Sequence, residues 1–217
     1  MNHASPLPKS PRYDRPEISL IEERLEPYGI AVYVGGREGM SNLPLLREHN
    51  ITTVVNCAVN LDINLVDAPD PSIEEGHLTY GHGAYRYYKL GLVDGAGNAE
   101  TMILAGYYQL LGALSQILPD RASYPRRERG NVLVNCRGGR SRSVALVALL
   151  LHKQMPDRYP TIEGALDHVR TRRELRPDEW FEAPKPMLVE ATRKASAWID
   201  RIDHRDPEHA DRDGHAQ

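Results

Sequence analysis

Several features that define large protein classes are scarce in this chain of 217 residues. It has only two cysteines, Cys57 and Cys136, which excludes a disulfide-stabilised scaffold. Its longest apolar run, residues 144–151, has eight residues, whereas a membrane-spanning helix needs about 20. The 27 basic and 30 acidic residues give no excess of positive charge, so we expect no nucleic-acid partner. The polar N-terminus has no hydrophobic signal core, and we expect a cytoplasmic protein.

Proline and polar residues mark both ends of the chain. Pro6, Pro8, Pro11 and Pro16 fall close together, so residues 1–17 are predicted to be a flexible segment. Almost no apolar residue occurs from residue 203 onward, and residues 203–217 are predicted to be a polar, disordered tail. Residues 18–202 are long enough for one domain with a buried core.

Strand-like and helix-like segments alternate within this domain. Apolar or β-branched runs predict short strands at residues 29–35, 51–58, 85–90 and 131–135. Capping residues, prolines and apolar spacing predict helices at residues 41–49, 101–119, 143–154, from Thr161 on, and 185–202. The alternation predicts an α/β domain with a central, mostly parallel sheet flanked by helices.

The segment with most chemical information joins the last predicted strand to the helix after it. It reads Asn135-Cys136-Arg137-Gly138-Gly139-Arg140-Ser141-Arg142-Ser143. A loop at a helix N-terminus points backbone N–H groups into one concavity, and its glycines let the chain turn tightly around an anion. The helix N-terminus and nearby guanidinium groups favour the thiolate of Cys136. We therefore expect nucleophilic attack on a bound phosphate, with Arg142 forking two oxygens and Ser143 donating to the departing sulfur.

These residues resemble the signature of the cysteine-dependent dual-specificity phosphatases, which is His-Cys, five residues, Arg, then Ser or Thr. The string at residues 139–143 is similar to the branch that contains phosphatidylglycerophosphate and phosphoinositide-type phosphatases. The resemblance, which extends more weakly over residues 28–198, implies a protein-tyrosine-phosphatase-like fold. It also implies hydrolysis of phosphate monoesters through a phosphocysteine on Cys136, without metal or cofactor. Phosphate would be bound by Arg142 and by the loop Arg137, Gly138, Gly139, Arg140 and Ser141.

The reaction also needs a general acid that protonates the leaving alkoxide. Asp94 is our candidate, because it follows a predicted strand in a glycine-rich loop, where the resembling family carries its acid. Asp67 and Asp70, in the long loop before that strand, are the fallback candidates. The dipeptide Asp94-Gly95 is also typical of a simple turn.

One departure from the signature bears on activity, because Asn135 stands where the family has histidine. A neighbouring imidazole helps to order the loop and hold the thiolate, whereas an amide carries no charge. We therefore expect Cys136 to be less acidic than in the family, with reduced or altered activity. A catalytically impaired phosphate-binding module is one alternative. A rhodanese-like sulfurtransferase with a persulfide on Cys136 is another, because residues 136–141 also resemble the rhodanese loop.

Arg137 and Arg140 are expected to face outward from the loop. They favour a multiply anionic substrate, an inositol phosphate or anionic phospholipid, while a phosphotyrosine or phosphoserine/threonine protein is the other expected partner. Pairing of both arginines with neighbouring carboxylates is an equal alternative. The basic residues 121–129 are either a peripheral membrane contact or a solvated face.

Cys57 ends the predicted strand 51–58, and the ends of parallel strands gather on the side that carries the site. Cys57 is therefore a candidate redox partner that would trap Cys136 in a disulfide upon oxidation. A small buried residue is the favoured alternative.

Overall fold

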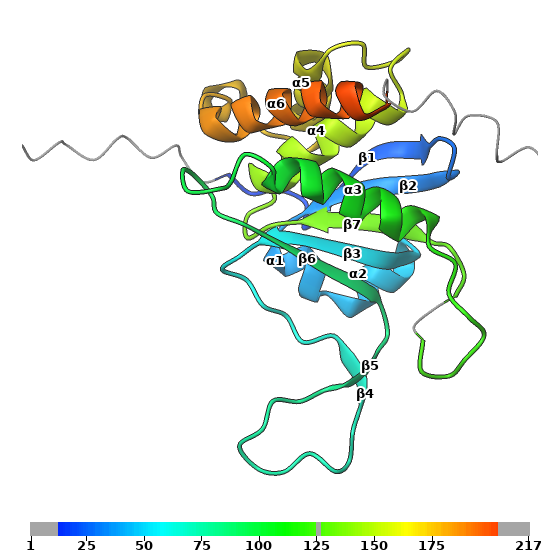
Figure 1. Ribbon diagram of the computed structural model, residues 1–217. Helices are drawn as coiled ribbons and strands as arrows, with labels where there is room; N and C mark the ends of the chain where they lie inside the picture. The colour runs from blue at the N-terminus through cyan, green and yellow to red at the C-terminus, as the bar shows by residue number, and fades with distance from the viewer. Residues whose placement is uncertain (1–12, 125–126, 204–217) are drawn as a thin grey trace, which may run out of the picture.

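A five-stranded sheet forms the centre of the molecule (Figure 1), seen in a computed structural model that describes residues 13–124 and 127–203. Its strands are β1 (Ile18–Leu25), β2 (Ile30–Gly35), β3 (Ile51–Ala58), β6 (Arg86–Leu92) and β7 (Asn131–Asn135). They lie in the order β1-β2-β7-β3-β6, with β1 antiparallel to β2 and every other pair parallel. This arrangement confirms the predicted α/β class and its mostly parallel sheet.

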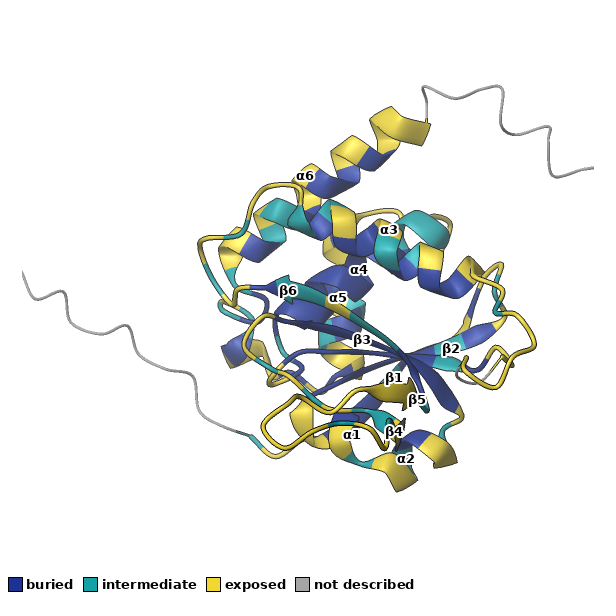
Figure 2. Cartoon of the chain, turned by 60° about the horizontal axis from the view of Figure 1, so that its bottom comes forward, coloured by how far each residue is buried: buried dark blue, intermediate teal, exposed yellow. Residues whose placement is uncertain are grey.

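Helices cover both faces of the sheet. They are α1 (Arg37–Ser41), α2 (Leu43–Glu48), α3 (Met102–Ser115), α4 (Arg142–Gln154), α5 (Ile162–Arg172) and α6 (Pro186–Asp203), with a short 3₁₀ turn, η1 (Pro177–Glu179). In Figure 1, α1 and α2 lie below the sheet, α4 to α6 lie above it, and α3 is drawn across its front. All eight residues of β3 are buried between these layers, which explains its uninterrupted β-branched and apolar sequence. Figure 2 shows that α4 is buried along most of its length, because other helices cover it on the side away from the sheet.

The helix expected at residues 41–49 is confirmed as α2, which Asn42 caps by accepting a hydrogen bond from the N–H of Leu45 at 3.2 Å. The short helix α1 before it was not predicted, and one predicted helix boundary was wrong. The helix expected to reach residue 119 ends at Ser115. Strand β1 was absent from the predicted strands, because charged residues interrupt its apolar pattern. One of them, Glu22, is buried and accepts hydrogen bonds from Arg158 and Tyr159.

The long loop after β3 carries a two-stranded arm that projects from the body (Figure 1). The arm consists of β4 (Val66–Pro69) and β5 (Gly81–Gly83), paired antiparallel. It holds Asp67 and Asp70, the two fallback candidates for the general acid. Asp70 accepts hydrogen bonds from the backbone and side chain of Ser72 within the arm.

The predicted end segments fall mostly outside the described residues, since residues 1–12 and 204–217 are not among them. The same holds for Arg126 of the predicted basic run. Within the described part of the chain, no helix combines the length and the apolar character that crossing a bilayer requires.

Candidate active site

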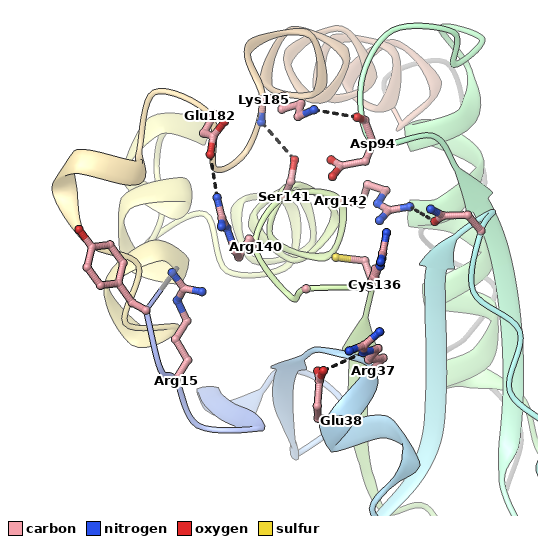
Figure 3. Close-up of a pocket in the computed structure, with 14 residues that line it drawn as sticks. Arg15, Arg37, Glu38, Asp94, Cys136, Arg140, Ser141, Arg142, Glu182 and Lys185 are labelled. Carbon is pink, nitrogen blue, oxygen red and sulfur yellow. Dashed lines mark hydrogen bonds and ion pairs between the residues drawn. The ribbon is translucent and has the colours of Figure 1, made fainter. Parts of the chain in front are cut away.

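The cysteine loop, residues 136–141, connects β7 to α4 at the carboxyl ends of the parallel strands, where ligands bind in open α/β sheets. It opens into a cavity of about 550 Å³ (Figure 3). The predicted residues that line this cavity are Asp94, Cys136, Arg137, Gly138, Arg140, Ser141 and Arg142. The structure therefore brings Asp94 together with the cysteine loop, although more than forty residues separate them along the chain.

Cys136 is buried, with 2% of its surface exposed, and its Sγ lies 3.3 Å from the Oγ of Ser143. Burial alone raises the pKa of the thiol. The Ser143 hydroxyl, backbone hydrogen bonds at Ser143 and Arg140, and the positive charge of Arg142 oppose this effect, so that the pKa of Cys136 is lowered below its ordinary value. This cavity therefore favours a nucleophilic thiolate.

Arg142 is also buried, at 2% exposed, and the structure anchors one end of its guanidinium group. Nη1 donates to the side-chain oxygen of Asn60 at 3.0 Å and to the carbonyl of Leu92 at 3.1 Å. Nε is buried and has no hydrogen-bond partner among the described residues. Because Figure 3 places this side chain beside Cys136, Nε is a donor that an oxyanion bound at the sulfur can satisfy.

Contacts with β2, Arg173 and Arg37 hold the backbone of the cysteine loop in place. Gly139 has a φ of +62°, and a Cβ at this position would lie 2.6 Å from the carbonyl carbon of Gly35 at the end of β2. The Gly139 carbonyl accepts from Nε of the buried Arg173 at 3.1 Å. On the other side, the N–H of Arg37 donates to the carbonyl of Arg137 at 3.1 Å. Glycine at position 139 is thus required both for its conformation and for the close approach of β2.

Asp94 is exposed, in a loop between β6 and α3 that the side chain of Asn98 closes. Asn98 accepts from the N–H of Val93 at 2.8 Å and donates to the carbonyls of Val93 at 2.9 Å and Gly95 at 3.1 Å. Figure 3 shows the Asp94 carboxylate facing the cavity on the side of Arg142. The carbonyl oxygen of Asp94 accepts from Nζ of Lys185 at 3.0 Å.

The two remaining loop arginines differ in their surroundings. Arg140 forms ion pairs with Glu182, at 2.9 Å, and with the fully buried Glu179, at 3.5 Å. Its charge is therefore compensated by carboxylates, so the alternative in which both loop arginines pair with carboxylates describes Arg140 only. Arg137 is exposed at the cavity mouth.

Sequence reasoning missed seven of the residues that line the cavity: Tyr13, Arg15, Arg37, Glu38, Asn60, Glu182 and Lys185. Tyr13 donates a hydrogen bond to Asp178, and the guanidinium of Arg176 lies 3.9 Å from the centre of its ring. Arg15 pairs with Glu179. These contacts place the described part of segment 1–17 along one wall of the cavity. Its prolines indicated flexibility and gave no sign of a partner far along the chain.

Two further predicted residues lie beneath the loop. Asn135 is fully buried, and neither atom of its amide has a partner among the described residues. Cys57 is fully buried at the end of β3. Its burial, reinforced by the nearby Cys136 and opposed by Arg142, raises the pKa of the Cys57 thiol well above its ordinary value. The described residues contain no cluster of His, Cys, Asp and Glu side chains suited to a metal ion.

Comparison with known proteins supports the fold. No protein-family model matches the chain. Among solved structures, human DUSP28 has 18% identity, with a TM-score of 0.53 over 91% of this chain and 99% of that one. A mouse putative dual specificity phosphatase complexed with zinc tungstate has 19% identity and a TM-score of 0.54 over 91% and 96%. The human tyrosine phosphatase-like serine/threonine/tyrosine-interacting protein has 19% identity and a TM-score of 0.54 over 84% and 97%. The chain thus has the fold of these proteins, which confirms the predicted protein-tyrosine-phosphatase-like architecture.

Proposed function

We propose that this protein is a phosphatase that hydrolyses phosphate monoesters through a phosphocysteine on Cys136. The observation that carries the proposal is the buried Sγ of lowered pKa beside the buried guanidinium of Arg142, whose Nε lacks a partner among the described residues. The fold, which is shared with dual-specificity phosphatases, supports the same conclusion.

In the first step, the loop N–H groups and Arg142 bind the phosphate oxygens, and Sγ of Cys136 attacks phosphorus. The S–P bond forms as the ester P–O bond breaks, and the leaving oxygen takes a proton from the carboxyl group of Asp94. In the second step, water attacks phosphorus and gives its proton to the Asp94 carboxylate. The S–P bond breaks, its electron pair returns to sulfur, and the hydroxyl of Ser143 donates to the departing thiolate. The products are an alcohol and inorganic phosphate.

For the substrate, we favour a phosphorylated protein. The sequence favoured inositol phosphates and anionic phospholipids because Arg137 and Arg140 together carry two positive charges. Glu182 and Glu179 compensate the charge of Arg140, which leaves less positive charge for such a substrate. The cavity of about 550 Å³ also has room for a side chain as well as its phosphate. An anionic phospholipid or inositol phosphate is the second substrate class to test, because Arg137 is exposed at the cavity mouth.

The test is phosphate release from phosphopeptides, phosphoinositides, inositol phosphates and phosphatidylglycerophosphate. We expect release by the wild type, loss of release in Cys136→Ser, and retention in Cys57→Ser, the same substitution at a cysteine outside the cavity lining. Absence of release from every compound, with phosphate still bound, would support the phosphate-binding module instead. Transfer of sulfur from thiosulfate to cyanide that depends on Cys136, without phosphate release, would support the sulfurtransferase.

A further inference from the structure

Lys185 connects the cysteine loop, the start of α6 and the loop at residues 93–98 that carries Asp94 (the Asp94 loop). Its main chain is bonded to the cysteine loop. It lies between Pro184 and Pro186, and a residue before proline is restricted to extended conformations. Its N–H donates to Oγ of Ser141 at 3.1 Å, and its carbonyl accepts from the N–H of Leu188 at 2.9 Å in the first turn of α6. The start of α6 is therefore tied directly to the loop that carries Cys136.

The side chain of Lys185 extends this connection to the Asp94 loop. Its Nζ donates to the carbonyl oxygen of Asp94 at 3.0 Å, as the dashed line in Figure 3 shows. The base of the same loop is held by Arg142, whose Nη1 donates to the carbonyl of Leu92 at 3.1 Å. The Asp94 loop is thus attached at two points, to the first residue of α4 through Arg142 and to the cysteine loop through Lys185.

The choice of acceptor is informative. The ammonium group bonds the main-chain carbonyl of Asp94, and no ion pair joins it to the Asp94 carboxylate in the described structure. The observed bond instead fixes the loop and leaves the carboxyl group facing the cavity.

We propose that Lys185 is a positioning residue that holds the Asp94 loop against the cysteine loop, so that the carboxyl group lies beside the leaving oxygen. This inference rests on the proposed function. Loops attached by few hydrogen bonds open locally at low free-energy cost, and misplacement of a catalytic group by about 1 Å can cost about 10²-fold in rate. Without Lys185, the Asp94 loop is expected to sample positions in which the acid is too far from the substrate.

The first experiment compares two aryl phosphates that differ in their need for an acid. The quantity compared is kcat/KM, which reports on the steps up to departure of the leaving group and excludes the hydrolysis step that both substrates share. Lys185→Met is expected to keep kcat/KM on p-nitrophenyl phosphate within about twofold and to lower kcat/KM on phenyl phosphate about tenfold, because general acid catalysis, worth roughly 10²–10⁴-fold, matters for the poorer leaving group. Lys185→Arg, which keeps the charge and the donors, is expected to restore most of the loss. In an Asp94→Asn background, Lys185→Met is expected to have no further effect, since Lys185 acts through Asp94.

Lys194 provides the matched control. It lies on α6, the helix that Lys185 directly precedes, and forms an ion pair with Glu100, just beyond the Asp94 loop, at 2.8 Å. Lys194→Met is expected to leave the ratio of the two rates unchanged. An equal loss on both aryl phosphates in Lys185→Met, or a loss that persists in Asp94→Asn, would overturn the proposal and indicate that Lys185 binds phosphate or supports the fold.

The second experiment does not depend on catalysis. Amide hydrogen exchange in Lys185→Met is expected to be faster at residues 93–98 than in the wild type and unchanged in β7 and α4. Unchanged exchange at residues 93–98 would overturn the positioning role even in an active enzyme. If the wild type releases no phosphate from either compound, the proposed function fails, and the exchange measurement still decides whether Lys185 holds the loop.

Discussion

Removing the hydroxyl of Ser143 is predicted to make Cys136 less acidic. The Oγ of Ser143 lies 3.3 Å from Sγ, both residues are buried, and this hydroxyl is the strongest of the contacts that lower the pKa of Cys136. A hydrogen bond to a charged group is worth about 1.5–3 kcal/mol, and about 1.4 kcal/mol corresponds to one pKa unit. The pKa in Ser143→Ala is therefore expected to rise by about one to two units. A raised pKa means that the thiolate fraction, and with it the reactivity at neutral pH, falls.

The assay is the rate of Cys136 alkylation by iodoacetamide as a function of pH, followed by mass spectrometry of the peptide that contains Cys136. The wild-type midpoint is expected below the ordinary thiol value of about 8.5, and the Ser143→Ala midpoint above that of the wild type. Ser141→Ala is the control, because its hydroxyl accepts from the N–H of Lys185. Its midpoint is expected to stay close to that of the wild type. Equal midpoints for Ser143→Ala and the wild type would refute the assignment of the lowered pKa to the Ser143 hydroxyl.

Three more substitutions test other parts of the site. Asp94→Asn is expected to lower kcat on phenyl phosphate by about 10²-fold or more while vanadate still binds; a rate near that of the wild type would exclude Asp94 as the acid. Gly139→Ala is expected to lower the free energy of unfolding by more than the roughly 1–2 kcal/mol that a positive φ costs by itself, since its Cβ would lie 2.6 Å from the backbone of Gly35. Urea unfolding measures this loss, and unchanged stability would contradict the close packing. Asn135→Leu is expected to preserve stability or raise it by about 1 kcal/mol, because it removes a buried amide without a partner; a clear loss of stability in urea would show that the amide is in fact satisfied.

The cysteine loop was the part of the site that sequence could predict best, because its chemistry is contiguous. A strand, a turn with glycines and a helix N-terminus follow one another within a few residues around Cys136, so the concavity is set by local structure. Predicting the position of Asp94 required long-range information as well, since its place in the cavity depends on how β6 lies beside β3. Parallel strands have their carboxyl ends at the same edge of the sheet, which is why a loop after a strand was a good place to look for the general acid.

The rest of the site depends on long-range contacts that no local pattern encodes. Arg15 and Glu179 pair across 164 residues, and the proline-rich sequence around Arg15 indicated only flexibility. Pairing of Arg140 with a carboxylate was one of two alternatives, and no local pattern indicated its partner, Glu182. Strand β1 was missed for the same reason, because the buried charge of Glu22 is neutralised by Arg158, in the turn between α4 and α5.

The central claim is that Cys136 carries the phosphoryl group during turnover. The most direct measurement is rapid acid quenching of the wild type during hydrolysis of p-nitrophenyl phosphate, followed by mass spectrometry of its peptides. We predict the added mass of one phosphoryl group on the peptide that contains Cys136, and no such mass on that peptide from Cys136→Ser. Phosphate release that continues in Cys136→Ser, or a phosphoryl group on a different residue, would contradict the account.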